Sequence, residues 1–194
     1  VCTDGIVISA DRRIKDKLII DSSINKIYEV DKHIAASAAG ILSDARVLIE
    51  RAQIIAQQHK VTYDSEIDVE SVVKEIANIK QMATQYGGIR PFGVSVLIAG
   101  VDNNKGKVFA SDVTGNYLSY KATSIGENDE RIREMLRQQY NENINIEQGI
   151  KLVLKIFKEI LGKNFDISRF DAAYIDGSRK LNRLSTDALK KYLK

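Results

Sequence analysis

The side chains in this sequence that could do chemistry are few and scattered. Two residues of nucleophile type, Cys2 and Thr3, stand side by side near the start, and Cys2 is the only cysteine. The two histidines, His33 and His59, lie far apart, and the absence of a Cys/His cluster argues against a zinc site. We expect His33 to occupy a strand edge and His59 to complement the dipole of a helix end. The sequence predicts no metal and no other cofactor.

The overall charge is nearly balanced, with 29 Lys and Arg residues against 26 Asp and Glu residues. Basic residues are spread along the chain, which argues against a nucleic-acid partner. No apolar run approaches the ~20 residues of a membrane helix, and Asp4 and Gly5 interrupt any signal peptide at once. Because a single cysteine cannot form an intrachain disulfide, the composition fits a reducing, cytoplasmic compartment.

The elements that must position these residues can be predicted from hydrophobic periodicity. Short apolar runs bounded by turn residues predict strands. The predicted strands cover residues 6–8, 18–20, 26–30, 34–39, 92–99, 107–111, 117–120, 122–125, 171–175 and 181–184. The run 92–99 is almost continuously apolar, which indicates a strand covered on both faces.

Apolar residues at three- and four-residue spacing predict helices over residues 45–56, 69–86, 132–140 and 150–161, with a short helix after residue 185. Residues suited to helix caps flank these segments. They are Ser43, Asp68, Asn128 or Asp129, Asn145 with Gln148 as a capping box, and Ser185 at the starts, and Gly87, Gly88 and Gly162 at the ends.

The order of these elements predicts the fold class. Strands come in groups instead of alternating with single helices, which favours antiparallel sheets over a doubly wound parallel sheet. Two pairs of amphipathic helices need surfaces to bury against, and a strand that is apolar on both faces needs two partners. We therefore expect an α+β fold, a four-layer αββα sandwich. The only proline is Pro91, so no Pro-rich linker divides the chain, and we expect a single domain over residues 1–194.

One segment of the sequence resembles a known family. Residues 85–102 read QYGGIRPFGVSVLIAGVD, which is similar to the signature of proteasome α subunits between their second helix and fifth strand. Residues 23–27, 37–48 and 120–126 agree with the same family in order and spacing. The resemblance covers essentially the whole chain and is strongest to archaeal α subunits. It implies the Ntn-hydrolase fold, which is an αββα sandwich.

The signature loop contains residues suited to a sharp change of direction. Two glycines tolerate positive φ after a helix, and the proline that follows fixes φ and rejects further helix. Without the resemblance, these residues would indicate only a helix terminator. The candidate loop residues are Gly87, Gly88, Arg90, Pro91, Phe92 and Gly93.

The resemblance implies that the chain is not catalytic by itself. Active members of the family use an N-terminal Thr, Ser or Cys whose own α-amine acts as the base. Here Val1 comes first, and the nucleophile-type residues behind it carry no free amine while Val1 stays attached. Asp11 and Lys26 match the acid and the lysine of active relatives, and we interpret them as vestigial. Residues 125–127 stand where catalytic β-type subunits carry a serine-containing turn.

For Lys26 the resemblance implies another role. In α subunits this lysine lines a pocket between neighbouring subunits, where it pairs with the C-terminal carboxylate of a regulatory ATPase or other activator. Gly40 and Ile41 match further pocket positions, at which a glycine lets the tail approach the backbone. The alternative for Lys26 is an ordinary solvated strand lysine.

The sequence therefore predicts a non-catalytic α subunit in the seven-membered outer ring of a 20S proteasome, stacked on β subunits and supporting gating, activator docking and intracellular protein degradation. A catalytic β-type threonine endopeptidase whose nucleophile lies outside the sequence is one alternative. A monomeric binding module that shares only the fold is another. The resemblance places Val1 inside the family's first strand, so we expect the N-terminal gate segment to be absent.

Overall fold

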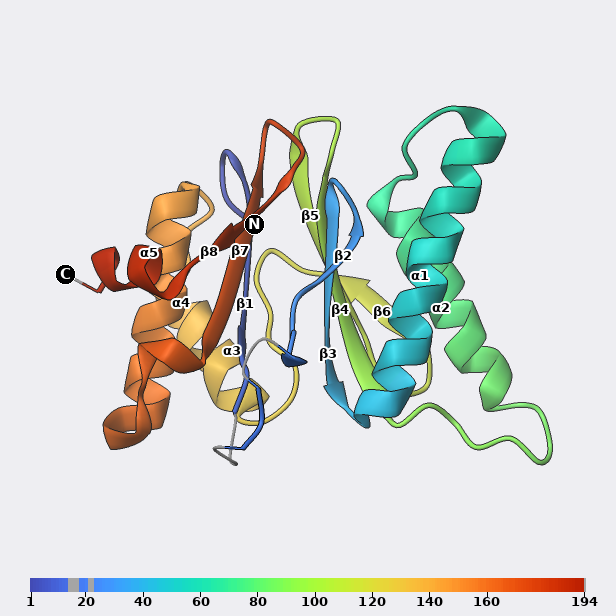
Figure 1. The fold of residues 1–194 in the computed structure, drawn as a ribbon, viewed down its shortest axis with the longest axis horizontal. Helices are drawn as coiled ribbons and strands as arrows, with labels where there is room; N and C mark the ends of the chain where they lie inside the picture. Colours follow the sequence, from blue (N-terminus) through green and yellow to red (C-terminus); the bar gives the residue numbers. More distant parts are fainter. Residues whose placement is uncertain (14–17, 21–22, 194) are drawn as a thin grey trace.

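The computed structural model describes residues 1–13, 18–20 and 23–193. It stacks two antiparallel sheets between two layers of helices (Figure 1). Helices α1 and α2 cover one outer side, and α3, α4 and α5 lie on the other. The predicted four-layer αββα sandwich is confirmed.

The first sheet contains three strands in the order β1-β7-β8. Their bounds are β1 (Gly5–Asp11), β7 (Phe170–Asp176) and β8 (Leu181–Leu184). β1 pairs with β7 along its full length, with Gly5 opposite Asp176 and Asp11 opposite Phe170. The predicted last hairpin, β7–β8, is confirmed.

The second sheet contains five strands in the order β2-β3-β4-β5-β6. Their bounds are β2 (Tyr28–Asp31), β3 (Ile34–Gly40), β4 (Val94–Asp102), β5 (Lys105–Ser111) and β6 (Tyr117–Ser119). β4 lies at the centre, and side chains alternate along it. Val96 and Ile98 pack under α1 and α2, whereas Ala99 and Val101 face the first sheet. The prediction of a strand covered on both faces is confirmed.

The described helices are α1 (Leu42–Tyr63), α2 (Val69–Ala83), α3 (Asp129–Gln139), α4 (Ile146–Leu161) and α5 (Thr186–Lys191). Three predicted N-caps are confirmed by side-chain hydrogen bonds. The Asp68 side chain accepts from the amide of Ser71 at the start of α2, Asn145 and Gln148 form a capping box on α4, and Ser185 accepts from the amide of Ala188 in α5. These bonds satisfy amides that have no partner inside the helix.

Gly162 is the C-cap residue of α4, as predicted. Two further predicted caps were wrong, and the one at α3 is right in position only. α1 starts one turn earlier than its apolar pattern suggested, with Ile41 rather than Ser43 at the N-cap. α2 ends at Ala83, before the two glycines, because the Thr84 hydroxyl donates to the carbonyl of Gln81 and closes the last turn. At α3 the N-cap residue is Asn128, but its side chain makes no capping bond.

Two predicted strands were also wrong. Leu18–Ile20 is an apolar run without strand structure, and its side chains are exposed. The 122–125 segment leaves the sheet after the amide of Tyr120 bonds to the carbonyl of Val108, and it then runs as a loop. The predicted strand 26–30 begins only at Tyr28. An apolar run alone does not determine whether a neighbouring strand is available to pair with it.

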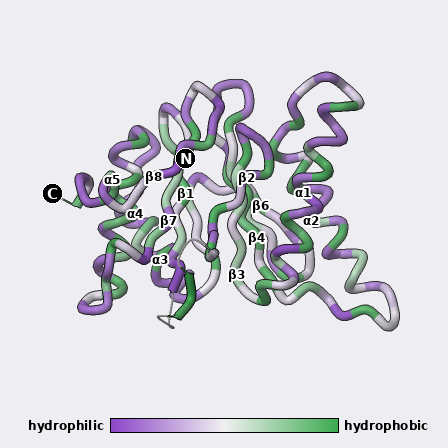
Figure 2. The backbone as a smooth tube through the Cα atoms, viewed as in Figure 1, coloured by the Kyte–Doolittle hydropathy of each residue, from purple (hydrophilic) through white to green (hydrophobic). Residues whose placement is uncertain are grey.

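Three apolar interiors separate the four layers. One lies between α1/α2 and the five-stranded sheet, a second between the two sheets, and a third between the three-stranded sheet and α4/α5. In Figure 2 the helices alternate between hydrophilic and hydrophobic segments, as amphipathic helices do when one face covers a sheet.

A buried lysine fastens α2 to the five-stranded sheet. Lys80 is completely buried, and its Nζ lies 2.9 Å from the hydroxyl of Ser111. Burial lowers the pKa of Lys80 to about 8, although the charge of Asp112 opposes that shift. Gly115 lets the β5–β6 turn approach the helix, since a Cβ there would lie 2.4 Å from the carbonyl oxygen of Ala77.

We expect Lys80 to make stability depend on alkaline pH. Its folded pKa of about 8 lies below the ordinary value of 10.5. Between these values the unfolded chain binds more protons than the folded chain, so this contribution to stability rises with pH and is constant below that window. Urea unfolding of the wild type and Lys80→Met over this range should give a stability difference that shifts toward the wild type as pH rises. Lys74→Met, at an exposed position of the same helix, should show no such trend; a pH-independent difference for Lys80→Met would contradict the assignment.

Candidate functional site

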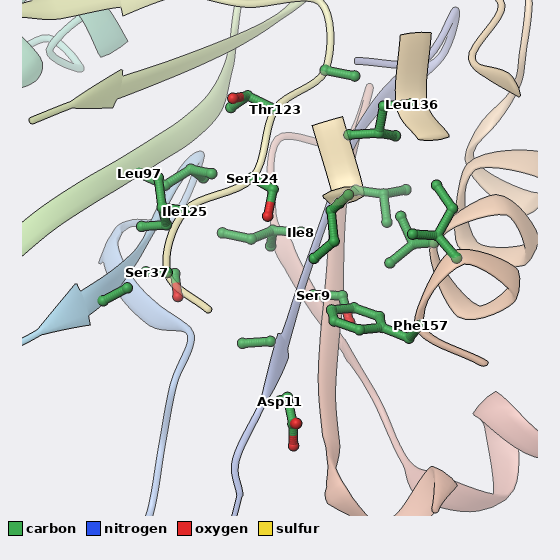
Figure 3. Close-up of a pocket in the computed structure, with 18 of the residues that line it drawn as sticks. Ile8, Ser9, Asp11, Ser37, Leu97, Thr123, Ser124, Ile125, Leu136 and Phe157 are labelled. Atoms are coloured by element: carbon green, nitrogen blue, oxygen red, sulfur yellow. The ribbon is translucent and has the colours of Figure 1, made fainter. Parts of the chain in front are cut away.

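A cavity of about 500 Å³ lies between the two sheets and α3/α4. Figure 3 shows Ile8, Ser9 and Asp11 along β1 on one side, with Ser37 of β3 across from them. The loop over residues 122–128 and apolar side chains of α3 and α4 complete the wall. Asp11, Lys26 and Gly40, which are far apart in the sequence, all line this cavity.

Asp11 is held by an arginine. Its Oδ2 accepts from Nη2 of Arg169 at 2.6 Å, and its Oδ1 accepts from Nε of the same residue at 3.2 Å. Arg169 ends the 3-10 turn that leads into β7, so the pair ties the end of β1 to the start of its partner strand. Among the described ion pairs none joins Asp11 to Lys26. A carboxylate engaged in this two-pronged way has a structural partner of its own.

Lys26 lies in a bend just before β2 and not on a strand. Its amide donates to Oδ2 of Asp171 at 3.1 Å, and its carbonyl accepts from the hydroxyl of Ser37 at 2.7 Å. These bonds fix the backbone on both sides of the residue. The side chain is partly buried and lines the cavity. None of the ion pairs between described residues includes the Lys26 ammonium.

Gly40 and Ile41 form the turn between β3 and α1. Gly40 has a φ of +131°, and a Cβ there would lie 2.3 Å from the carbonyl oxygen of Gly93. That same carbonyl accepts from the amide of Ile41 at 2.9 Å. The Ile41 side chain is 46% exposed. A glycine is therefore required at position 40 both for its backbone conformation and for the close approach of another strand.

The start of α1 carries a buried acid that sequence reasoning did not single out. Asp44 lies in the first turn of the helix and accepts from both terminal nitrogens of Arg90, at 2.6 and 2.7 Å. Its Oδ2 also accepts from the amide of Gly93 at 2.9 Å. The hydrogen bonds from Arg90 and Gly93 lower the pKa of Asp44 to about 2. The carboxylate is therefore ionised at neutral pH.

The signature loop divides into two parts. Gly87 and Gly88 lie in an exposed turn, and a Cβ on either would meet no atom within 4 Å, although Gly88 has a φ of +81°. In the second part, Phe92 packs partly against the interior under α1 and α2. A Cβ on Gly93 would lie 2.6 Å from Cδ1 of Ile41. Pro91 is exposed, and its carbonyl accepts from Arg90.

The structure thus brings the predicted residues together in part. Lys26 and Gly40 share a cavity wall, and the second half of the signature loop is attached to the Gly40–Ile41 turn. The two glycines of the first half face open space, since a Cβ on either would meet no atom within 4 Å. Asp44 could have been noticed from its acidic type in the first turn of a predicted helix, whereas nothing in the sequence pointed to Arg169 as the partner of Asp11.

Two further side chains that could do chemistry, Cys2 and His33, are buried in the fold. Cys2 is buried, and burial raises the pKa of its thiol, which lowers its reactivity. His33 was predicted at a strand edge, and it lies in the β2–β3 turn directly before β3. It is completely buried, and its Nε2 lies 2.8 Å from the carbonyl oxygen of Ile67. Within the part of the chain that the structure describes, no group of three or more His, Cys, Asp and Glu residues could hold a metal ion.

Comparison with known protein families gives a match over residues 1–175 to the family described as proteasome subunit. The chain belongs to the proteasome subunit family. The fold agrees with the match, since the sandwich of two sheets and two helix layers is the one that the resemblance to this family implied.

Several archaeal relatives within the proteasome subunit family carry the name proteasome subunit alpha. The chain is 44% identical to the one from Methanocaldococcus jannaschii over 86% of its own length, and it spans 65% of that relative. It is 41% identical to the one from Methanococcus maripaludis over its whole length, which is 74% of that relative. The Methanosarcina acetivorans protein is 38% identical, with 98% of this chain and 77% of the relative covered. The chain thus spans about two thirds to three quarters of these relatives.

None of the described helices is both long enough and apolar enough to cross a bilayer.

We expect Gly40→Ala to destabilise the protein. The added methyl group would collide with the carbonyl of Gly93, and the positive φ would cost about 1–3 kcal/mol in itself. Gly87→Ala serves as the control, because a Cβ there meets only open space. Chemical denaturation should give a lower free energy of unfolding for Gly40→Ala and a change within about 0.5 kcal/mol for Gly87→Ala. Equal effects of the two substitutions would contradict the packing described for Gly40.

Proposed function

We propose that this chain is a non-catalytic proteasome α subunit. The proposal is supported by its family and by the α-subunit names of relatives that are about 40% identical to it. We further propose that residues 1–194 form one domain, and that the protein acts in the cytoplasm as part of a complex that degrades proteins.

The surroundings of the candidate catalytic residues support the non-catalytic part of the proposal. The lysine and the acid of an active-type site need each other's charge, but here Asp11 is engaged by Arg169. Cys2 is buried against α4, where a Cβ on Gly149 would lie 2.8 Å from its sulfur. Burial also raises the pKa of this thiol, so little of the nucleophilic thiolate is present at neutral pH.

We propose that the subunit occupies the outer, seven-membered ring and contacts β subunits. A repeated head-to-tail contact closes into a ring when its rotation permits. Exposed apolar side chains along α1 support burial against other subunits. Val47, Ile54 and Val61 recur at seven-residue spacing and so lie on one face of that helix.

We propose that Lys26, Gly40 and Ile41 receive the C-terminal tail of a regulatory ATPase or another activator. The observation that carries this proposal is the Lys26 side chain, which lines the cavity beside Gly40 and takes part in no ion pair between described residues. An ammonium in such a place favours a carboxylate ligand. Ile41 is not among the residues that line the cavity, but its exposed side chain next to Gly40 offers the tail an apolar contact.

The assembly is tested on the full-length protein. Native mass spectrometry alone and with the cognate β subunit should give seven-membered rings and then stacked particles. Peptide turnover should appear only when the β subunit is present. A monomer under both conditions would support a binding module instead, and peptide cleavage by the purified chain alone would support the β-type alternative.

We expect Lys26→Ala to weaken activator binding without disturbing assembly. A hydrogen bond between charged groups contributes about 1.5–3 kcal/mol, so tail affinity should fall at least roughly ten-fold. The measurement is activator-stimulated peptide hydrolysis in reconstituted particles, with native mass spectrometry to follow the rings. Lys32→Ala, at an exposed lysine of the β2–β3 turn, is the matched control. Unchanged stimulation in Lys26→Ala particles would refute the role of this lysine.

A further inference from the structure

We propose that Arg90 and Asp44 are positioning residues for the tail pocket, and that they act by fixing the Gly40–Ile41 turn through Gly93. This inference rests on the proposed function of the pocket. Arg90 and Asp44 would not touch the tail themselves. They would set the geometry of the Gly40–Ile41 backbone, which contacts the tail.

The first link is the ion pair itself. Both terminal nitrogens of Arg90 donate to the Asp44 carboxylate, one to each oxygen. This two-pronged geometry restricts the guanidinium in direction as well as in distance. Asp44 also lies in the first turn of α1, where the helix dipole favours a negative charge. The pair therefore joins the start of α1 to the end of the signature loop.

The second link is Gly93. Its amide donates to Oδ2 of Asp44, the same oxygen that accepts from Nη1 of Arg90. Its carbonyl accepts from the amide of Ile41. The amide of Gly93 is therefore bonded to the ion pair and its carbonyl to the Gly40–Ile41 turn. These two bonds connect the ion pair to the proposed pocket.

The third link is the fit of the turn against Gly93. A Cβ on Gly40 would lie 2.3 Å from the Gly93 carbonyl oxygen, and a Cβ on Gly93 would lie 2.6 Å from Cδ1 of Ile41. The two segments therefore meet at contact distance with no room for a side chain on either glycine. A shift of Gly93 must move the Gly40–Ile41 turn or break the bond between them.

Exposure explains why the pair acts on position more than on overall stability. The Asp44 side chain is 9% exposed, whereas that of Arg90 is 61% exposed. When Arg90 is removed, water can take the place of its exposed guanidinium beside Asp44, which limits the loss of global stability. Without Arg90, Asp44 can still accept from Gly93, so the fold should persist while the loop loses its restraint.

The test uses full-length protein reassembled with its β subunit and a synthetic peptide that ends in a free carboxylate, compared with the same peptide amidated at its C-terminus. Arg90→Ala should reduce affinity for the free-carboxylate peptide about five-fold or more, in the range typical of coupling between sites. Arg90→Lys, which keeps the charge and one donor, should restore part of the affinity. Arg46→Ala is the matched control, because this exposed arginine of α1 pairs only loosely with Glu50 at 3.9 Å.

Amide hydrogen exchange gives a readout that a general loss of stability would not produce. In Arg90→Ala, the amides of Ile41 and Gly93 should exchange faster, while that of Ile98 in central β4 stays unchanged. Thermal unfolding of the ring should shift little.

The outcomes separate the two proposals. If amidation and Lys26→Ala leave peptide binding unchanged, the pocket itself is wrong. If both weaken binding but Arg90→Ala matches Arg46→Ala in affinity and exchange, the pocket stands and the positioning role is overturned. Faster exchange at Ile98 together with Ile41 would also overturn it, since the effect would then be global.

Discussion

The face-to-face packing of the two sheets is the constraint on which the rest of this structure depends. Ala35, Ala99 and Ala173 point into the interface and are completely buried, and larger side chains such as Ile6 and Ile175 fill the space around them. Small residues let the sheets approach closely, while the opposite faces of the same strands bury the helices. Side chains alternate along a strand, so a shift of one residue in strand register would move each side chain to the opposite face of its sheet. Neither the other sheet nor the helix layer would then meet a complementary surface.

This packing also determines where a site can form. The cavity lies where strands from both sheets, the 122–128 loop and helices α3 and α4 meet. Lys26 reaches it from a bend at the edge of the five-stranded sheet, where Asp171 of the other sheet and Ser37 of β3 hold its backbone. The lining of the cavity thus comes from both sheets. The site is therefore a property of the interface and not of one element.

Two arginine–carboxylate pairs connect the ends of helices and strands that are distant in the sequence. Asp11 and Arg169 join the end of β1 to the start of β7, and Asp44 and Arg90 join the start of α1 to the segment before β4. In both cases the pair lies where regular hydrogen bonding stops and backbone direction changes. Charged, directional contacts suit such places, because they supply the restraint that a ladder or helix no longer provides.

The sequence by itself determined the helices, most of the strands and the caps that Asp68, Asn145 and Ser185 make, since all of these depend on residues a few positions apart. It also carried the family resemblance that the comparison with known families confirmed. Only the tertiary structure decided that the apolar run 18–20 forms no strand, and that Asp11 pairs with Arg169 and Asp44 with Arg90. Such pairings join residues far apart in the chain, and local pattern holds no information about which distant group the packed sheets bring within reach.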